Sequence, residues 1–255
     1  QATLESHADL GIIFDTDVDR MSAVLHDGSE VNRDAIIAMM AAILADEYPG
    51  GTVVTDSVTS DRLTRFLEED LGLKHHRFKR GYKNVINESR RLNAEGILSP
   101  LAIETSGHGA LSENYFLDDG AYLAVKLLIA AANARRQGKQ VDSLIAGLPP
   151  LFEAREYRMK IAGEGFQRYG QEVLEAFETR AQERGFQIAP NSYEGVRLSF
   201  DSEAVQGWML LRMSLHDPLM PLNLEGRREG DCARLTGIAK ELLAGFDRLD
   251  LSPLG

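Results

Sequence analysis

Three aspartates, Asp15, Asp17 and Asp19, alternate along the chain directly after the apolar run 11–14. The apolar run predicts a buried strand, and the acidic segment predicts the loop that leaves it. Alternate residues of an extended chain point the same way, so the three carboxylates should share one face and need a positive charge among them. A hard divalent cation such as Mg²⁺ fits this need, and the adjacent Arg20 is suited to a phosphate beside that metal.

Other interpretations of this acidic segment compete. A solvated acidic turn is common and needs no ligand. An aspartyl-nucleophile phosphatase of the haloacid dehalogenase type also begins with a strand followed by Asp-x-Asp, but Asp19 stands where that family has a hydroxyl or a small apolar residue. An EF-hand calcium loop is excluded, because it needs Gly at its sixth position and Glu at its twelfth, where this chain has Arg20 and His26.

Composition narrows the classes of partner. The chain has 255 residues, a net charge of −11 and an apolar fraction of 44%, which is ample for packed cores. The acidic balance disfavours nucleic acid and anionic membranes as partners, and no apolar run approaches the roughly 20 residues of a membrane span. Cys232 is the only cysteine, so no internal disulfide can form, and we expect a cytoplasmic protein.

Hydrophobic periodicity predicts two successive domains with different folds. Up to residue 148, helices are expected at 32–45, 61–71, 85–94 and 120–136, and strands at 11–14, 52–56, 75–78 and 97–103. This alternation predicts an α/β domain with a mixed, largely parallel sheet, whose ligands bind at the carboxyl ends of the strands. Asp118 and Asp119 are expected to cap the last helix, and the hydroxyl-rich segment 55–60 to cap the second.

Leu148-Pro149-Pro150 predicts a boundary. Beyond it, strands are expected at 157–161, 195–200, 207–213 and 219–224, and helices from 166 to about 185 and at 231–247. Successive strands between two helices predict a smaller α+β domain.

Three segments together carry a family resemblance. Residues 15–20 are Asp-Thr-Asp-Val-Asp-Arg, residues 104–108 are Glu-Thr-Ser-Gly-His, and residues 212–218 are Arg-Met-Ser-Leu-His-Asp-Pro. They resemble, in order, the metal loop (Asp-Gly-Asp-x-Asp-Arg), the sugar loop (Glu-x-Ser-Gly-His) and the phosphate loop (Arg-x-Ser-Asn/Gly-Thr-x-Pro) of the α-D-phosphohexomutases. That family includes phosphoglucomutase, phosphomannomutase and phosphoglucosamine mutase.

The chain also departs from the family's pattern. Thr16 and Val18 replace small residues in the metal loop, while Leu215 and His216 replace a polar pair in the phosphate loop. The motif around the phosphorylated serine of the family's first domain does not occur in these residues. The chain begins at Gln1, and the resemblance implies a C-terminal fragment.

In that fragment, 1–29 would be the end of domain two, 30–150 the sugar-binding α/β domain three, and 151–255 the phosphate-binding, TATA-binding-protein-like α+β domain four.

The resemblance assigns a role to each candidate residue. Glu104 can accept hydrogen bonds from two sugar hydroxyls, Ser106 can donate or accept one, and His108 can reach a hydroxyl or a phosphate. Arg212 can hold phosphate bidentately with Ser214 beside it. The plain alternatives are a turn signature at 104–106, a surface or core histidine, and a surface arginine.

Catalytic roles would fall to Arg20, His108 and Lys83. Lys83 follows Gly81 in a loop that faces the cleft in family members, and there it would assist phosphoryl or proton transfer. A solvated lysine at a helix start is the alternative.

The implied reaction interconverts the 1-phosphate and 6-phosphate of glucose or mannose. It needs Mg²⁺, passes through glucose 1,6-bisphosphate or mannose 1,6-bisphosphate, and uses a phosphoserine of the missing N-terminal domain. The fragment alone should therefore bind a phosphorylated hexose without turning it over. The alternatives are a non-catalytic sugar-phosphate-binding module and an aspartyl phosphatase that uses Asp15.

Overall fold

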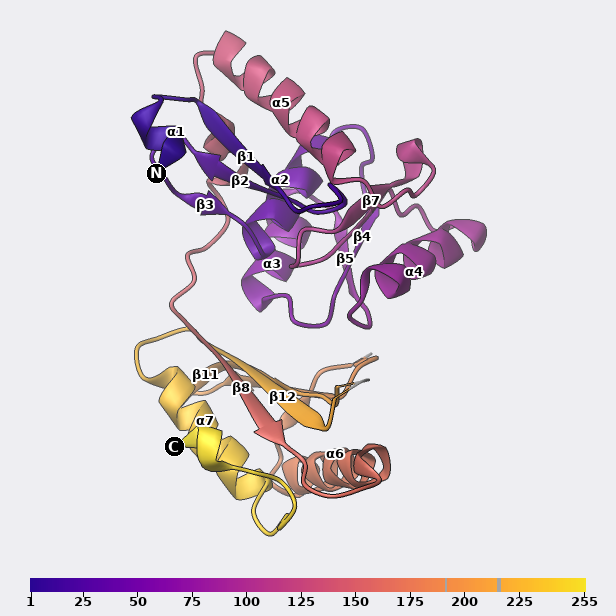
Figure 1. Ribbon diagram of the computed structural model, residues 1–255, viewed down its shortest axis with the longest axis vertical. Coiled ribbons are helices and arrows are strands. Elements are labelled where there is room, and N and C mark those ends of the chain that lie inside the picture. The colour runs from indigo at the N-terminus through magenta and orange to yellow at the C-terminus, as the bar shows by residue number, and fades with distance from the viewer. Residues whose placement is uncertain (191, 215–216) are drawn as a thin grey trace. The chain divides into compact units, whose positions relative to one another are not determined.

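The chain divides into two compact units, Gln1–Pro149 and Pro150–Gly255, in a computed structural model that describes residues 1–190, 192–214 and 217–255 (Figure 1). The division falls between the two prolines of the predicted boundary. Each unit has its own sheet and its own hydrophobic core.

The first unit contains the predicted largely parallel sheet, with strands in the order β5-β4-β6-β7. Its strands are β4 (Thr52–Thr55), β5 (Lys74–Arg77), β6 (Leu101–Ile103) and β7 (Gly109–Leu111). β5 and β6 run parallel to β4, and β7 is antiparallel to β6. The strand expected at 97–103 is shorter than predicted, since it begins only after Pro100.

Helices surround this sheet. They are α2 (Asp34–Leu44), α3 (Asp61–Arg65) continued by the π-helical turn η1 (Phe66–Asp70), α4 (Tyr82–Ala94) and α5 (Gly120–Arg136). The side chain of Asp119 caps α5 by accepting a hydrogen bond from the backbone N–H of Tyr122, as expected of an N-cap aspartate. The parallel strands and their crossover helices place the loops 56–60, 78–81 and 104–108 at one end of the sheet.

A small antiparallel sheet, β1-β2-β3, precedes the β5-β4-β6-β7 sheet along the chain. It comprises β1 (Leu10–Phe14), β2 (Met21–Leu25) and β3 (Glu30–Val31), after the short helix α1 (Ala2–Glu5). Alternate residues of β2 are buried in the same core as Leu101, Leu111 and Leu123. The β1–β2 turn, residues 15–20, is therefore fixed relative to the main sheet. The strand predicted at 11–14 forms as part of β1, but the prediction that it is buried is wrong, because Ile13 and Phe14 are exposed. β2 and β3 were not predicted.

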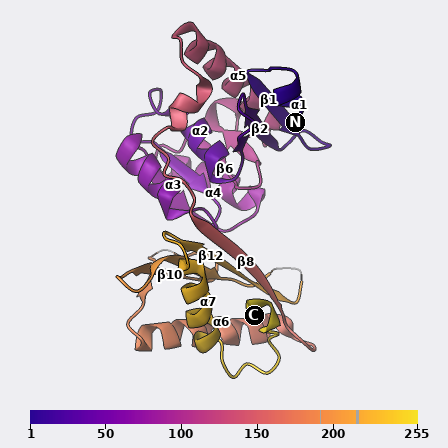
Figure 2. The ribbon, with the colours of Figure 1, turned by 90° about the vertical axis from the view of Figure 1, so that its left-hand side faces the viewer.

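The second unit is the predicted α+β domain. Its antiparallel sheet has the order β8-β12-β11-β10-β9, and its strands are β8 (Glu153–Lys160), β9 (Gln187–Ile188), β10 (Val196–Asp201), β11 (Gln206–Leu211) and β12 (Leu219–Gly226). Helices α6 (Phe166–Glu183) and α7 (Asp231–Leu242) pack on one face (Figures 1 and 2). α7 ends before the predicted residue 247.

Candidate functional site

The acidic loop and the 104–108 loop are joined through the backbone. Arg20 and His108 form an isolated antiparallel bridge, and the N–H of Met21 donates to the carbonyl of Gly107 over 3.1 Å. The first loop is the β1–β2 turn and the second is the β6–β7 turn, so each is anchored by the strands on both sides. The structure thus brings together two predicted loops that are far apart in the sequence.

Two glycines make this close approach possible. Gly107 has φ +96°, and a Cβ there would lie 2.7 Å from the carbonyl oxygen of Met21. Gly120, the first residue of α5, packs against the acidic loop, where a Cβ would lie 2.8 Å from the carbonyl oxygen of Val18. Any larger residue at either position would push the acidic loop away.

The acidic loop has the geometry of a cation site. Asp15, Asp17 and Asp19 offer carboxylate oxygens that lie within 4.8 Å of one another. Asp19 Oδ1 is buried and meets no hydrogen-bond donor in the part of the chain that the structure describes. An all-oxygen donor set with an unsatisfied buried oxygen fits Mg²⁺.

Arg20 lies on this loop in close contact with one of its carboxylates. Its Nε is 2.5 Å from Asp15 Oδ2, and its backbone N–H donates to Asp15 Oδ1 over 3.2 Å. Desolvation raises the pKa of Asp15, but the hydrogen bonds and charge of Arg20 outweigh it, so that this pKa lies below its usual value. Asp15 is accordingly ionised at neutral pH, as a metal ligand must be.

His108 is held between an acid and an aromatic ring. Its Nδ1 lies 2.8 Å from Asp118 Oδ2 and 3.7 Å from Asp19 Oδ2. The ring of Tyr82 stacks on the imidazole, with centroids 4.8 Å apart. The prediction that Asp118 caps α5 is wrong: Asp119 occupies the N-cap, and Asp118 turns instead to His108.

Glu104 connects the 104–108 loop to the 78–81 loop, which leads into α4. Its Oε1 accepts a hydrogen bond of 2.6 Å from the N–H of Gly81, and its Oε2 accepts one of 3.1 Å from the hydroxyl of Ser106. Glu104 is buried and Ser106 is exposed. Lys83 is exposed as well and lies in the first turn of α4, not in a loop, so the structure matches the alternative of an exposed lysine at a helix start. Its Nζ lies 5.7 Å from the ring centroid of Tyr82. The three loops therefore form one cluster, with Lys83 at its edge.

Sequence reasoning missed Asp56, which follows β4. Its side chain is fully buried, accepts a hydrogen bond of 2.6 Å from the hydroxyl of Thr105, and has Arg80 Nε 3.9 Å away. Desolvation raises its pKa to about 7, against the hydrogen bond from Thr105. The only sequence signal for Asp56 was an acidic residue at the end of a predicted strand. The whole segment 55–60 was instead predicted to cap the following helix. Capping does explain Ser60, which accepts from the N–H of Arg62.

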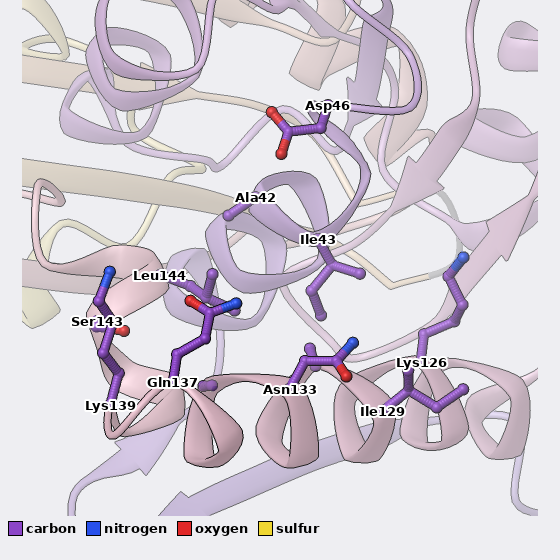
Figure 3. A pocket seen from close by; sticks show the side chains of 12 residues that line it. Ala42, Ile43, Asp46, Lys126, Ile129, Asn133, Gln137, Lys139, Ser143 and Leu144 are labelled. Atoms are coloured by element: carbon purple, nitrogen blue, oxygen red, sulfur yellow. The ribbon is translucent and has the colours of Figure 1, made fainter.

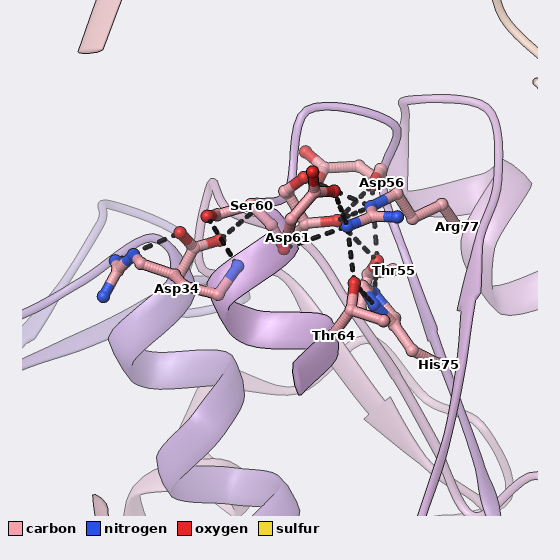
Figure 4. Close-up of polar contacts among 10 residues, drawn as sticks. Asp34, Thr55, Asp56, Ser60, Asp61, Thr64, His75 and Arg77 are labelled. Carbon is pink, nitrogen blue, oxygen red and sulfur yellow. Dashed lines mark hydrogen bonds and ion pairs between the residues drawn. The ribbon is translucent and has the colours of Figure 1, made fainter. Parts of the chain in front are cut away.

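A polar network holds the segment that follows Asp56 (Figure 4). Arg77, the last residue of β5, donates to the carbonyl of Ser60, to Asp61 and to the hydroxyl of Thr64. His75 bridges the hydroxyls of Thr55 and Thr64. The network fixes the turn between β4 and α3. Its role is therefore to support the neighbouring loops, not to bind a ligand.

Arg212 and Ser214 belong to the second unit. Arg212 directly follows β11, is buried, and has Nη1 3.6 Å from Glu194 Oε1. The hydroxyl of Ser214 accepts from the N–H of Asp217 over 3.2 Å. Leu215 and His216, the predicted departures in the phosphate loop, lie outside the described residues.

Residues 32–152 match the family Phosphoglucomutase/phosphomannomutase, alpha/beta/alpha domain III. This segment belongs to that family, and the chain as a whole resembles the α-D-phosphohexomutases. The matched segment contains the whole β5-β4-β6-β7 sheet and the loops 78–81 and 104–108.

Curated relatives agree with this assignment. A phosphomannomutase/phosphoglucomutase of Pseudomonas syringae is 27% identical over 235 residues, which are 92% of this chain and 46% of the relative. A phosphoglucosamine mutase of Marinobacter nauticus is 31% identical over 250 residues, which are 97% of this chain and 48% of the relative. The chain spans about half the length of the curated relatives it matches.

A crystal structure of a phosphoglucomutase/phosphomannomutase family protein from Burkholderia thailandensis has the same fold. Its TM-score is 0.76 at 23% identity, and the match covers 96% of this chain and 48% of that one.

The first unit also has a cavity away from the loop cluster. It lies between α2, α5 and the 3₁₀ turn η3 (Val141–Ile145), and its volume is about 490 Å³ (Figure 3). Its lining mixes apolar Ile43, Ile129 and Leu144 with Asp46 and Lys126. None of the predicted site residues lines it.

In the described ranges, no helix has both the length and the apolar composition that a membrane crossing needs.

Proposed function

We propose that this chain supplies the metal, sugar and phosphate loops of a Mg²⁺-dependent phosphohexomutase. The substrates would be the 1-phosphate and 6-phosphate of glucose or mannose, interconverted through the 1,6-bisphosphate. The observation that carries the proposal is the backbone pairing of Arg20 with His108, because it unites an oxygen-rich cation site with a loop of sugar-binding character. The curated relatives are phosphomannomutase/phosphoglucomutases and phosphoglucosamine mutases.

Asp15, Asp17 and Asp19 would hold the Mg²⁺. When bound, this cation supplies positive charge beside a phosphoryl group. Arg20 supplies a second, fixed positive charge next to it, and Lys83 supplies a third from an exposed position at the edge of the cluster.

The sugar would bind to the 104–108 loop. Ser106 is exposed and Glu104 lies beneath it, so a sugar hydroxyl can replace Ser106 as the donor to Glu104 Oε2. When Nδ1 of His108 donates to Asp118, its Nε2 keeps a lone pair that can accept a proton from a sugar hydroxyl. Arg212 and Ser214 of the second unit would bind a phosphate group.

The phosphoryl donor would be a phosphoserine outside these 255 residues. The chain alone should then bind phosphosugars without catalysing their interconversion.

Cys232 is buried, and burial raises the pKa of its thiol to about 11, which fits a structural thiol in a reducing cytoplasm.

A thermal-shift panel on the purified chain tests the binding part. Glucose, mannose and glucosamine 6-phosphates and glucose 1,6-bisphosphate are added with and without Mg²⁺. At about 100 times Kd, a ligand should raise Tm by roughly 5–10 °C. Glu104→Gln and Arg212→Ala should each reduce this rise, whereas the matched Glu229→Gln, at an exposed position, should not. If no phosphosugar raises Tm in the wild-type chain, binding by these loops is refuted.

Turnover in the whole protein separates a mutase from a binding-only module. Hexose 1-phosphate conversion that is lost in Asp17→Asn supports the mutase, and binding without conversion supports the module. An aspartyl phosphatase is the less favoured alternative, because Asp19 stands where that family has a hydroxyl or a small apolar residue. Phosphate release by the chain that disappears in Asp15→Asn would revive that alternative.

A further inference from the structure

Asp56 lies beneath the 104–108 loop and contacts it directly. Its side chain is fully buried at the end of β4, and its Oδ2 accepts the hydroxyl hydrogen of Thr105 over 2.6 Å. Its Oδ1 is buried too and meets no donor in the described part of the chain. A carboxyl group in such a place costs free energy, since it loses water and the interactions with Thr105 and Arg80 only partly replace it.

Thr105 stands between the two residues that would contact a sugar. Its neighbours are Glu104, whose carboxylate holds the N–H of Gly81, and Ser106, whose hydroxyl is exposed. The Thr105 hydroxyl points inward to Asp56 while these two side chains serve the ligand side of the loop. Fixing Thr105 therefore fixes the turn from which both neighbours project.

We propose that Asp56 is a positioning residue, which holds the 104–108 loop through Thr105 so that Glu104 and Ser106 present their oxygens to a hexose. The proposal rests on the proposed function, because it concerns the sugar half of the ligand. The charged groups that face Asp56 are Arg80, 3.9 Å from Oδ2, and Glu104. Arg80 attracts the Asp56 carboxylate and Glu104 repels it, so Asp56 interacts with the 78–81 loop as well as with the 104–108 loop.

The test removes the hydroxyl and then restores it. Thr105→Val keeps the side-chain shape but leaves Asp56 without its donor, whereas Thr105→Ser keeps the hydroxyl. Thr236→Val is the control, because the hydroxyl of Thr236 also donates to a fixed acceptor, the carbonyl of Cys232, but Thr236 lies in the second unit. Asp56→Ala removes the other partner, and Thr105→Val keeps the test valid if Asp56→Ala does not fold.

Two quantities are measured for each folded variant. Amide hydrogen exchange reports the order of residues 104–108, and calorimetry gives the affinity for glucose 6-phosphate and for inorganic phosphate. Thr105→Val should speed loop exchange and weaken glucose 6-phosphate binding about 5- to 10-fold, without weakening inorganic phosphate binding. Thr105→Ser should restore both values, and Thr236→Val should change neither.

The outcomes separate the two claims. Unchanged exchange at 104–108 in Thr105→Val overturns the positioning role, whatever the affinities are. An equal loss of glucose 6-phosphate and inorganic phosphate binding overturns it as well. If the wild-type chain binds no glucose 6-phosphate, the sugar ligand of the proposed function fails, and faster loop exchange in Thr105→Val would still support Asp56 as the residue that positions this loop.

Discussion

Arg20 and His108 form an antiparallel backbone bridge, and through it the acidic loop and the 104–108 loop become one structure. Arg20 ends a hairpin turn of the small sheet, and His108 ends the turn between β6 and β7 of the main sheet. A change at the bridge should therefore disturb cation binding and sugar binding together.

Replacing Gly107 with alanine should break this bridge. The residue has φ +96°, and a Cβ would lie 2.7 Å from the carbonyl oxygen of Met21, so the strands must separate. We expect a loss of about 2–4 kcal/mol in the free energy of unfolding from strain and lost contacts. Urea denaturation measures it. Gly96→Ala is the control: φ is +80° but nothing lies within 4 Å of the new Cβ, so about 1 kcal/mol should be lost. Equal losses at the two positions would contradict the bridge argument.

Replacing Asp17 with asparagine should weaken Mg²⁺ binding without weakening the fold. Asp17 is exposed and shares the cation site with Asp15 and Asp19. Loss of one charged oxygen ligand should lower Mg²⁺ affinity at least tenfold, while the free energy of unfolding without metal changes by less than about 0.5 kcal/mol. Calorimetric titration and urea denaturation measure the two quantities. Asp27→Asn is the control, because Asp27 lies on the β2–β3 turn outside the site. Unchanged Mg²⁺ affinity in Asp17→Asn would show that these carboxylates do not hold the cation.

Strong local signals made much of the fold predictable. α5 was predicted with the bounds that the structure gives, because the Asp119 cap and Gly138 mark its two ends. The parallel sheet followed from the alternation of strands and helices. The acidic loop was found from its alternating carboxylates, and the motifs in order then resembled a family. The α/β class predicted the loops 15–20, 81–83 and 104–108 at the carboxyl ends of parallel strands. This is wrong for 15–20, because β1 belongs to a separate antiparallel sheet.

The contacts between those loops were not predictable from the sequence. β7 has three residues, among them a glycine and an alanine, so it lacks any strand pattern. Asp118 and Asp119 are adjacent acids before a helix, and only the path of the chain decides that the second caps and the first meets His108. Nothing local marks Asp56 as buried, since its burial comes from the packing of loops that are distant in the sequence.

Replacing Val18 with glycine should stabilise the metal-free chain. Val18 has φ +65°, and a β-branched residue is strained in this left-handed conformation. Its side chain is partly exposed, so little buried area is lost. Relief of strain minus the entropy cost of glycine should leave a gain of about 0.5–1 kcal/mol in the free energy of unfolding. The control is Val125→Gly in the exposed interior of α5, which should lose about 1 kcal/mol instead. A lower Tm for Val18→Gly would indicate that the Val18 side chain contributes more than its conformation costs.

Replacing Asp56 with asparagine should remove a pH dependence of stability. Burial raises the pKa of Asp56 from 3.8 to about 7, so the folded chain keeps a proton that the unfolded chain releases. The stabilisation by this proton is present below pH 4 and is lost as pH rises to about 7, a change of roughly 4 kcal/mol in the free energy of unfolding. Asparagine cannot ionise but still offers an oxygen to Thr105.

Urea denaturation of both proteins between pH 4.5 and pH 8 should show the stability of wild type falling relative to Asp56→Asn across this range. Because Asp250 is fully exposed, the control Asp250→Asn should follow the wild-type profile there. Parallel profiles for wild type and Asp56→Asn would mean that the buried carboxyl is ionised throughout, with Arg80 as its counter-charge.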